Sequence, residues 1–426
     1  MSANRSSARR EGDPVGTAQE ITASIEEQLS WQEELYKHFH RNPELGLKEH
    51  ETSARICEEL EDLGYEVQLI GGTGIVGVLR NGEGPVVLAR ADMDALPVTE
   101  DTGLEYSSEV PGAMHACGHD MHMATLLGAA KYLARNKEAW SGIYIALFQP
   151  AEETAAGAKA MVEDGLVDKI PTPEVALAQH VMPAEAGMIG TTAGPILSAG
   201  DCLRITVHGR GAHGSMPHNS VDPVVLASSI VLKLQTVVSR ETQPGHFAVL
   251  TVGSLTAGTT ANIIPDRAQL LLNIRTYEPA IRQRVIDSIH RIVRGECQAA
   301  GSPKEPEFEF YDQFPLTSND ETANAKITAA FEAHFPEGQV YHADPATASE
   351  DFSTIPDAFG IPYAYWTVGC VDPQKYKDAV AAGTVASDIP ANHSPFFAPV
   401  IHPTLQTATS TQVVAALAYL DNGAQE

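Results

Sequence analysis

Residues 85–91 read PVVLARA, a nearly continuous apolar run that ends at Asp92 and Asp94. Such a run is typical of a strand that is buried on both faces of a sheet. Helical and strand-like patterns then alternate along the chain: a helix over 121–134, a strand over 143–148, a helix over 153–163 and a strand over 175–179. This alternation predicts an α/β fold with helices on the faces of a sheet, and ligands of such sheets bind where strands end.

The remaining segments predict a second domain inserted into the first. Before the apolar run, periodicity and turn residues indicate helices over 21–39 and 48–63 and strands over 65–69 and 75–79. Beyond residues 194–200 the pattern becomes βαββα, with a strand over 203–208, a helix from Asp222, strands over 247–253 and 267–275 and a helix over 279–300. After Pro303 we expect a return to the first domain, with a helix over 322–334, a strand over 363–368 and a final helix after Pro403.

These patterns predict a discontinuous first domain over residues 1–195 and 306–426, built as α/β/α layers on a mixed sheet. A smaller α+β domain of ferredoxin-like architecture is expected over 196–305. The length of 426 residues is sufficient for two domains of ordinary size.

The charge of the chain limits its partners. The formal net charge is −27, so nucleic acid or an anionic membrane surface would be repelled. We therefore expect neither as a partner. A substrate that carries a carboxylate would need locally placed positive charge, from an arginine or a metal ion.

The cysteines and the first residues indicate a reducing compartment. The chain has five cysteines and no CxxC pair, which predicts free thiols rather than a disulfide framework. Residues Met1–Thr17 are polar and no apolar stretch follows them, so we interpret them as a disordered leader and not as a signal peptide. No apolar run approaches the length needed to cross a bilayer, and we expect a cytoplasmic location.

Residue types that bind metals occur close to the predicted strand ends. The candidates are Cys117, His119, Glu152, Glu153, His180 and His393. A single histidine at a strand end is more often structural than a ligand, and a pair of glutamates is usually solvated. Several such residues at successive strand ends of one sheet can meet at one place, however, and together they predict a metal site.

The adjacent carboxylates Glu152 and Glu153 suit a division of labour in hydrolysis. One can bind a metal ion while the other takes a proton from the attacking water and returns it to the leaving amine. Two like charges side by side in a cleft are costly unless a cation neutralises them, which again favours a metal. Cys117 would be a thiolate when bound to a metal, and a small buried thiol otherwise.

Motifs spread over nearly the whole chain resemble the peptidase family of co-catalytic metallo-aminoacylases and carboxypeptidases. The resemblance is strongest to the branch of hippurate hydrolases and plant auxin-conjugate (amino acid conjugate) amidohydrolases. The motifs are HRNPELG (40–46) with Glu51-Thr52, RADMDALP (90–97), MHACGHD (114–120), FQPAEE (148–153), GRGAHGSMPH (209–218), NIIPDRA (262–268), SEDF (349–352) and HSPF (393–396). They follow the family's order, which makes them jointly specific.

The resemblance implies a role for each matching residue in the first domain. Two divalent metal ions per subunit, zinc or manganese with cobalt or nickel as further options, would be bound by Cys117 as the bridging ligand and by His119, Glu153, His180 and His393. Glu152 would be the general acid/base, and Asp94 would orient a ligand histidine. Asp92 stands where more distant members of the family have a ligand histidine, so the ligand set of the second metal stays open.

The resemblance also gives the inserted domain a part in the reaction, as a lid and a dimerisation surface. His213 would stabilise the developing oxyanion, often across a dimer interface, which implies a homodimer or a higher homo-oligomer. Asn262 and Arg275 would hold the substrate, although a surface salt bridge explains Arg275 equally well. His115, His122 and His218 lie near the motifs and are candidates for supporting contacts.

The activity implied by the resemblance is hydrolysis of N-acyl amino acids, with acetyl, benzoyl or similar acyl groups, to a carboxylic acid and a free amino acid. A dipeptidase or carboxypeptidase using the same two-metal site is an alternative, because it differs only in the pocket for the free amine. A catalytically silent relative that binds small molecules is a third hypothesis. Such a relative would be expected to lack the shuttle glutamate or several ligands, and here both are intact.

Overall fold

The computed structural model describes residues 18–420, so the leader expected over Met1–Thr17 lies outside the described residues. The described chain forms two compact units. The first unit consists of residues 18–194, 319–344 and 352–420, and the second consists of residues 195–318 and 345–351.

The first unit is built on an eight-stranded mixed sheet with the strand order β1-β2-β4-β3-β5-β16-β6-β15. The strands are β1 (Glu66–Leu69), β2 (Ile75–Asn81), β3 (Val86–Asp92), β4 (Gly142–Gln149), β5 (Val175–Glu185), β6 (Ile189–Thr191), β15 (Val340–His342) and β16 (Tyr363–Val371). The four central strands β4, β3, β5 and β16 run parallel. Strand β3 is the PVVLARA run, and it lies between β4 and β5 as a buried central strand.

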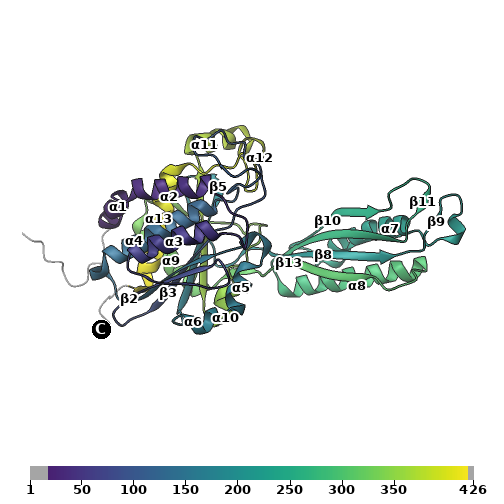
Figure 1. Cartoon of the computed structure of the whole chain (residues 1–426), viewed down its shortest axis with the longest axis horizontal. Coiled ribbons are helices and arrows are strands. Elements are labelled where there is room, and N and C mark those ends of the chain that lie inside the picture. The colour runs from purple at the N-terminus through teal and green to yellow at the C-terminus, as the bar shows by residue number, and fades with distance from the viewer. Residues whose placement is uncertain (1–17, 421–426) are drawn as a thin grey trace, which may run out of the picture. The chain divides into compact units, whose positions relative to one another are not determined.

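Helices cover both faces of this sheet (Figure 1), which confirms the expected α/β/α class. One layer contains α1 (Ala18–Glu26), α2 (Leu29–Arg41), α3 (His50–Asp62), α4 (His119–Arg135), α9 (Glu321–His334) and α13 (Ile401–Leu420). The other contains α5 (Gly157–Glu163), α6 (Leu166–Lys169) and α10 (Thr354–Phe359). The crossovers β3–α4–β4 and β4–α5–β5 run in opposite directions along the sheet, and right-handed crossovers of opposite direction lie on opposite faces. Helices α11 (Pro373–Ala382) and α12 (Val385–Asp388) follow β16.

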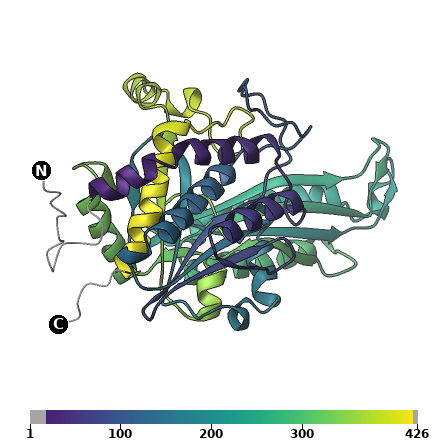
Figure 2. The same ribbon diagram turned by 60° about the vertical axis from the view of Figure 1, so that its left-hand side comes forward.

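Helix α4 lies at the centre of its layer, between α2 and α13 (Figure 2). Gly128 permits this packing, because a Cβ there would lie 1.8 Å from Gln32 Nε2 and 3.0 Å from Thr409 Cγ2. Gln32 Nε2 donates hydrogen bonds to the Ala124 carbonyl and to Thr409 Oγ1. This buried contact fixes the helix whose first residue is His119.

Two predicted helices differ from the structure. The helix expected over 21–39 is divided at residues 27–28, where the buried Gln28 side chain donates to the Gly128 carbonyl. The helix expected over 153–163 starts at Gly157, because a 3-10 turn, η2 (Glu152–Thr154), ends at Ala155 with a positive φ of 52°. The second difference matters for function, since this turn carries both candidate glutamates.

The second unit has the order β8 (Ala199–His208), α7 (Pro223–Thr236), β10 (Ala248–Ala257), β12 (Arg267–Thr276), α8 (Pro279–Ala300) and β13 (Glu307–Phe314). Its antiparallel sheet has the order β10-β12-β8-β13, which is the ferredoxin-like arrangement. The predicted boundary at residue 305 is too early, because β13 pairs with β8 as the fourth strand of this sheet. Residues 345–351 also belong to this unit.

Helix α7 bears on the expectation that no apolar run is long enough to cross a bilayer. Together with the π-helical turn that follows it, Pro223–Glu241 is long and apolar enough to cross a membrane by length and composition, with a mean hydropathy of 1.2. One face of α7 packs on the sheet through Leu226, Ile230 and Leu234, whereas Val225 and Leu232 remain 65% and 74% exposed. The high hydropathy and the exposed apolar side chains have one cause: α7 is an apolar helix, and only one of its faces packs on the sheet.

Candidate metal centre and catalytic site

The candidate residues of the first unit meet at one edge of its sheet. Strands β3, β4 and β5 are parallel, so their carboxyl ends share that edge. Asp92 ends β3, and the turn with Glu152 and Glu153 follows β4. The strand expected to stop before His180 instead continues to Glu185, so His180 lies within β5 and is held by its pairing with β16.

A tight turn places Cys117 and His119 on either side of Gly118. Gly118 is the N-cap residue of α4 and has a φ of 91°, a left-handed conformation that favours glycine. A Cβ at this position would lie 2.4 Å from Val181 Cγ2 on β5. The close approach of β5 therefore requires glycine between the two candidate ligands.

His119 has one ring nitrogen fixed and the other available. Nδ1 lies 2.8 Å from the Asp94 carbonyl, and because a carbonyl can only accept, Nδ1 carries the proton. Nε2 is buried and has no hydrogen-bond partner among the described residues. Carboxylate oxygens of Asp92, Glu153 and Glu152 lie 3.7, 3.9 and 4.0 Å from it. Burial lowers the pKa of His119, but the charge of Asp92 and the Asp94 carboxylate, whose Oδ1 lies 3.3 Å from Nδ1, outweigh it and raise the pKa well above its usual range.

His180 is oriented in the same way. Its Nδ1 donates to the Val181 carbonyl at 2.7 Å, which leaves Nε2 to face Cys117 Sγ at 3.5 Å. Burial and the neighbouring His122 lower the pKa of His180 well below its usual range, so the ring is neutral. A neutral imidazole with a fixed proton on Nδ1 is the form that binds metals through Nε2.

His122 supports this arrangement but cannot itself bind a metal here. Its Nε2 accepts the Val181 backbone N–H at 2.9 Å, and its Nδ1 donates to Asp92 Oδ1 at 2.5 Å. Asp92 Oδ2 accepts from Arg90 Nη1 at 2.7 Å. Both ring nitrogens of His122 and both carboxylate oxygens of Asp92 are thus engaged with protein groups. The sequence shows His122 only as a histidine three residues beyond His119; its role depends on the tertiary structure.

Cys117, Glu153 and His393 form a second group. One ligand atom of each lies within 4.8 Å of the other two, and His393 Nε2 is 3.2 Å from Glu153 Oε1. The nearby Cys117 and Glu153 raise the pKa of His393 to about 10, whereas burial and Glu153 raise the pKa of the Cys117 thiol. His393 has a positive φ of 69°, and its backbone N–H donates to the Ala116 carbonyl. This strained loop residue is held beside the other two side chains.

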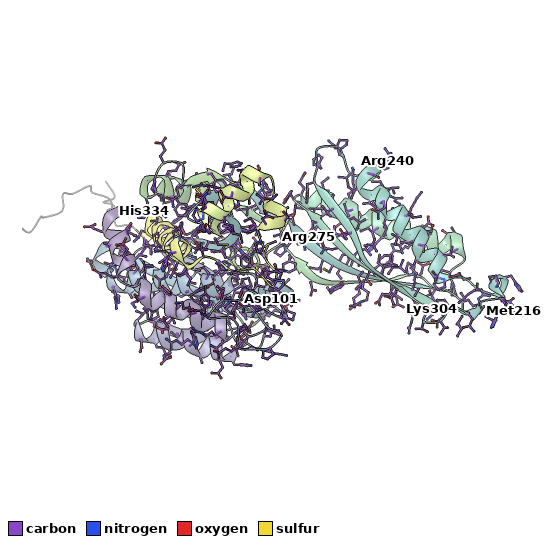
Figure 3. The ribbon with its side chains drawn as sticks, turned by 90° about the horizontal axis from the view of Figure 1, so that it is seen from above. Asp101, Met216, Arg240, Arg275, Lys304 and His334 are labelled. Atoms are coloured by element: carbon purple, nitrogen blue, oxygen red, sulfur yellow. The ribbon has the colours of Figure 1, made fainter. Side chains whose placement is uncertain are left out.

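The candidate residues of the second unit lie at its two ends. His213 is on β9 (Ala212–His213), which pairs with β11 (Ile263–Ile264), and the Gly214 N–H donates to the Asn262 carbonyl. Arg275 lies eight positions after Arg267 along β12, and Arg267 is the partner of His208 on β8. Eight steps of a strand span about 27 Å. Figure 3 labels Arg275 at one end of this unit and Met216, three residues beyond His213, at the other. One small substrate cannot contact both ends of the same unit.

Within this unit, His213 presents a free donor and Arg275 is partly engaged. His213 Nδ1 accepts from the Ser215 backbone N–H, so Nε2 carries the proton, and the side chain is exposed. Arg275 Nε donates to Asn273 Oδ1 at 2.9 Å, and Nη1 donates to Ser349 Oγ. The surface salt bridge considered for Arg275 is replaced by these neutral partners.

The residues of the first unit fit a pair of divalent cations. The candidate ligand atoms form two adjoining groups, His119 and His180 with Asp92 beside them, and Glu153 and His393, while Cys117 is near members of both. Thiolate, imidazole and carboxylate are the ligand types of zinc and of related divalent metals. His119 Nε2, which has no hydrogen-bond partner among the described residues, lies 3.9 Å from Glu153 Oε1, and a cation between them would interact with both.

Comparison with known proteins is consistent with this geometry. Residues 88–384 match the profile described as Peptidase family M20/M25/M40. N-acetyl-L-cysteine deacetylase of Bacillus subtilis is 37% identical over 348 residues, which covers 81% of this chain and 80% of that protein. Thermostable carboxypeptidase 2 of Saccharolobus solfataricus is 36% identical over 341 residues, covering 79% and 85%. Hippurate hydrolase of Campylobacter jejuni is 38% identical over 337 residues, covering 78% and 87%.

A solved structure shares the fold over almost the whole chain. The structure of a dinuclear metal binding peptidase of the M20 family from Bacillus subtilis superposes with a TM-score of 0.75 at 28% identity. The match covers 93% of this chain and 99% of that protein.

Proposed function

The chain belongs to peptidase family M20/M25/M40, as the resemblance of its motifs predicted, and from this premise we propose that it hydrolyses the amide bond of N-acyl amino acids. Two of its relatives are named for this reaction, on N-acetyl-L-cysteine and on hippurate, which is benzoylglycine. The observation that carries the proposal is the meeting of Cys117, Glu153 and His393 next to His119 and His180, with Glu152 beside them.

We propose that Cys117, His119, Glu153, His180 and His393 hold two divalent metal ions, zinc or manganese, or else cobalt or nickel. Bound metals supply Lewis-acid polarisation and a lowered pKa of water. The surplus of carboxylates around His119 supports cation binding, because like charges in a buried site need neutralisation. Arg90 and His122 already engage Asp92, which supports a positioning role for Asp92 rather than a ligand role.

Glu152 is the proposed proton shuttle. Its side chain is 6% exposed and lies 4.0 Å from His119 Nε2, beside the proposed ligands. In this position Glu152 takes a proton from the attacking water and delivers it to the leaving nitrogen. Asp94 is proposed to orient the ligand histidine His119, because its carbonyl and its Oδ1 lie 2.8 and 3.3 Å from His119 Nδ1. Its carboxylate also accepts the backbone N–H groups of Glu152 and Glu153.

The variant Glu152→Gln tests this assignment. We expect turnover of hippurate and N-acetyl-L-cysteine to fall by about 10²- to 10⁴-fold, while the metal content per chain stays unchanged. The exposed Glu163→Gln on α5 is the matched control and should retain activity. Retention of wild-type turnover by Glu152→Gln would remove the proposed shuttle.

A carboxypeptidase activity on the same site is the second candidate, because a relative of similar identity is named a carboxypeptidase. A panel of N-acetyl and N-benzoyl amino acids, dipeptides and N-blocked peptides, scored by released amine, separates the two. Cleavage confined to the acyl amino acids supports the amidohydrolase. Preferential cleavage of peptides supports the carboxypeptidase.

We further propose that the second unit completes the site of a partner subunit in a homodimer. His213 and Arg275 lie at opposite ends of this unit, so the two residues serve one substrate only if they come from different chains. In this arrangement Arg275 holds the substrate carboxylate, and Asn262 and the His213 Nε2–H face the oxyanion. The exposed apolar face of α7 and the edge strand β10 are suited to self-association, because an unpaired strand edge and an exposed apolar patch both favour a partner.

Mixed subunits test this arrangement. Glu152→Gln and His213→Ala are each expected to be nearly inactive as homodimers. When the two are unfolded together and refolded, half of the subunit pairs are mixed, and each mixed pair contains one intact site. Recovery of about a quarter of the wild-type activity supports the shared site, whereas no recovery contradicts it.

A cytoplasmic location is proposed on the thiols. All five cysteines are free in the described chain, as expected in a reducing compartment. Cell fractionation, with the chain detected by an antibody, would test this location.

A further inference from the structure

Two buried carboxylates hold the backbone of the turn that carries Glu152 and Glu153. The Ala151 N–H donates to Glu49 Oε1 at 3.0 Å. The next two amides donate to Asp94, Glu152 N–H to Oδ1 at 3.0 Å and Glu153 N–H to Oδ2 at 3.1 Å. Three consecutive amides thus converge on two carboxylates, in the manner of an anion-binding nest.

The turn needs such support because its backbone is strained. Ala151 and Ala155, which flank the 3-10 turn, have positive φ values of 46° and 52°. An alanine in this left-handed region clashes with its own carbonyl and persists only when surrounding contacts hold it. The bond from Ala151 N–H to Glu49 is formed at the first of these two strained residues.

Glu49 is itself built into the fold for this contact. It precedes α3, and its side chain is fully buried. Its second oxygen, Oε2, accepts from Thr73 Oγ1 at 2.7 Å. Burial raises the pKa of Glu49. A buried carboxylate destabilises the folded chain unless hydrogen bonds replace its lost hydration, and Glu49 accepts such bonds from Ala151 and Thr73. Glu49 does not belong to the candidate ligand groups.

We propose that Glu49 is a positioning residue of the amidohydrolase reaction, which fixes Ala151 in its left-handed conformation and so sets the place of the Glu152 carboxylate. The inference rests on the proposed function, because it gives Glu49 a role only if Glu152 moves the proton. In this proposal two residues support the turn. Asp94 holds the amides of Glu152 and Glu153, and Glu49 holds the amide that precedes them.

Kinetics of the metal-loaded enzyme with hippurate and N-acetyl-L-cysteine test the proposal. Glu49→Ala removes a charge-assisted hydrogen bond, and we expect kcat to fall by about 10- to 100-fold while KM changes by less than about 3-fold. Glu49→Gln keeps an oxygen that can accept from Ala151 and should lose less than about 5-fold. Glu51→Ala, on the exposed face of α3 two residues away, is the matched control and should leave kcat unchanged.

A second substitution separates positioning from a purely structural role. Glycine adopts positive φ without the clash, so Ala151→Gly should restore kcat of the Glu49→Ala variant by at least about 3-fold and change the wild-type kcat little. Unchanged kcat per metal-loaded folded chain in Glu49→Ala, with only a lower melting temperature, would overturn the inference. Absence of rescue by Ala151→Gly would also overturn it.

The two proposals fail differently. If Glu152→Gln is inactive and Glu49→Ala has wild-type kcat, the role of Glu49 is wrong and the proposed function stands. If Glu152→Gln keeps wild-type turnover, the proposed shuttle is wrong whatever Glu49 does.

Discussion

The buried histidine His40 lies between two carboxylates, and its proton makes the folding stability of the first unit fall as the pH rises into the alkaline range. His40, on α2, is fully buried, with Nδ1 2.6 Å from Asp120 Oδ2 and Nε2 3.2 Å from Glu100 Oε1. Both partners are acceptors when ionised, so both ring nitrogens carry protons and the ring is cationic. The contact joins α2, the start of α4 and the loop that contains Glu100.

The size of this pH dependence follows from the pKa of His40. Burial lowers the pKa of His40, but the hydrogen bonds to Asp120 and Glu100 outweigh it and raise the pKa from 6.5 to about 9. Between these two values the folded chain holds a proton that the unfolded chain has lost, so stability falls as pH rises. The proton on His40 stabilises the folded chain by about 3 kcal/mol. This contribution is fully present below pH 6.5 and is lost as the pH rises through 9.

Urea unfolding between pH 6 and 10 measures this loss. The three tryptophans, Trp31, Trp140 and Trp366, all belong to the first unit, so their fluorescence reports its unfolding. Metal is first removed with a chelator, because proton release on metal binding would add its own pH dependence. His40→Gln is the test variant, and His38→Gln, on the same helix, is the control.

We expect wild type and His38→Gln to lose about 3 kcal/mol more than His40→Gln between pH 6.5 and 9. The excess stability of wild type over His40→Gln should therefore narrow as the pH rises. Parallel curves for wild type and His40→Gln, or a gap that widens with pH, would refute the assigned proton on His40.

Two further predictions concern the metal site. Gly118→Ala combines left-handed strain with the contact to Val181, so we expect unfolding free energy to fall by about 2–5 kcal/mol and metal affinity to drop at least about tenfold. Gly64→Ala, where φ is 82° and a Cβ would meet nothing within 4 Å, should cost only about 1–2 kcal/mol, and an equal loss in both variants would argue against the contact. Chelation should abolish hydrolysis of hippurate, and urea unfolding followed by tryptophan fluorescence should stay cooperative; unchanged hydrolysis in metal-free protein would contradict the metal requirement.

The sequence predicted the central strands and most of the candidate residues because both leave local signals. An apolar run such as PVVLARA reports burial on both faces, and the residues beyond it report the edge where ligands bind. Strand β13 shows a local signal that was missed: Glu307-Phe308-Glu309-Phe310 alternates polar and apolar residues, as a half-buried strand does. Its recognition would have moved the predicted boundary beyond residue 305.

Other features have no local signal. Alanine has no preference for positive φ, so the strained turn at Ala151 and Ala155 follows only from contacts with Glu49 and Asp94, which are distant in sequence. The extension of β5 beyond His180 likewise depends on pairing with β16, nearly two hundred residues later in the chain. The strained turn and the extension of β5 are both set by tertiary contacts, so local residue propensities could not predict them.

Protein groups orient the candidate metal-binding side chains of the first unit. Backbone carbonyls of Asp94 and Val181 fix the Nδ1 protons of His119 and His180, so each Nε2 is directed into the site without further ordering. In small zinc domains the metal supplies the free energy of folding, because the site does not exist without it. Here the sheet and α4 supply the site, and His393 alone among the candidate ligands comes from an exposed, strained loop. Metal loss should therefore remove the chemistry and leave the first unit folded.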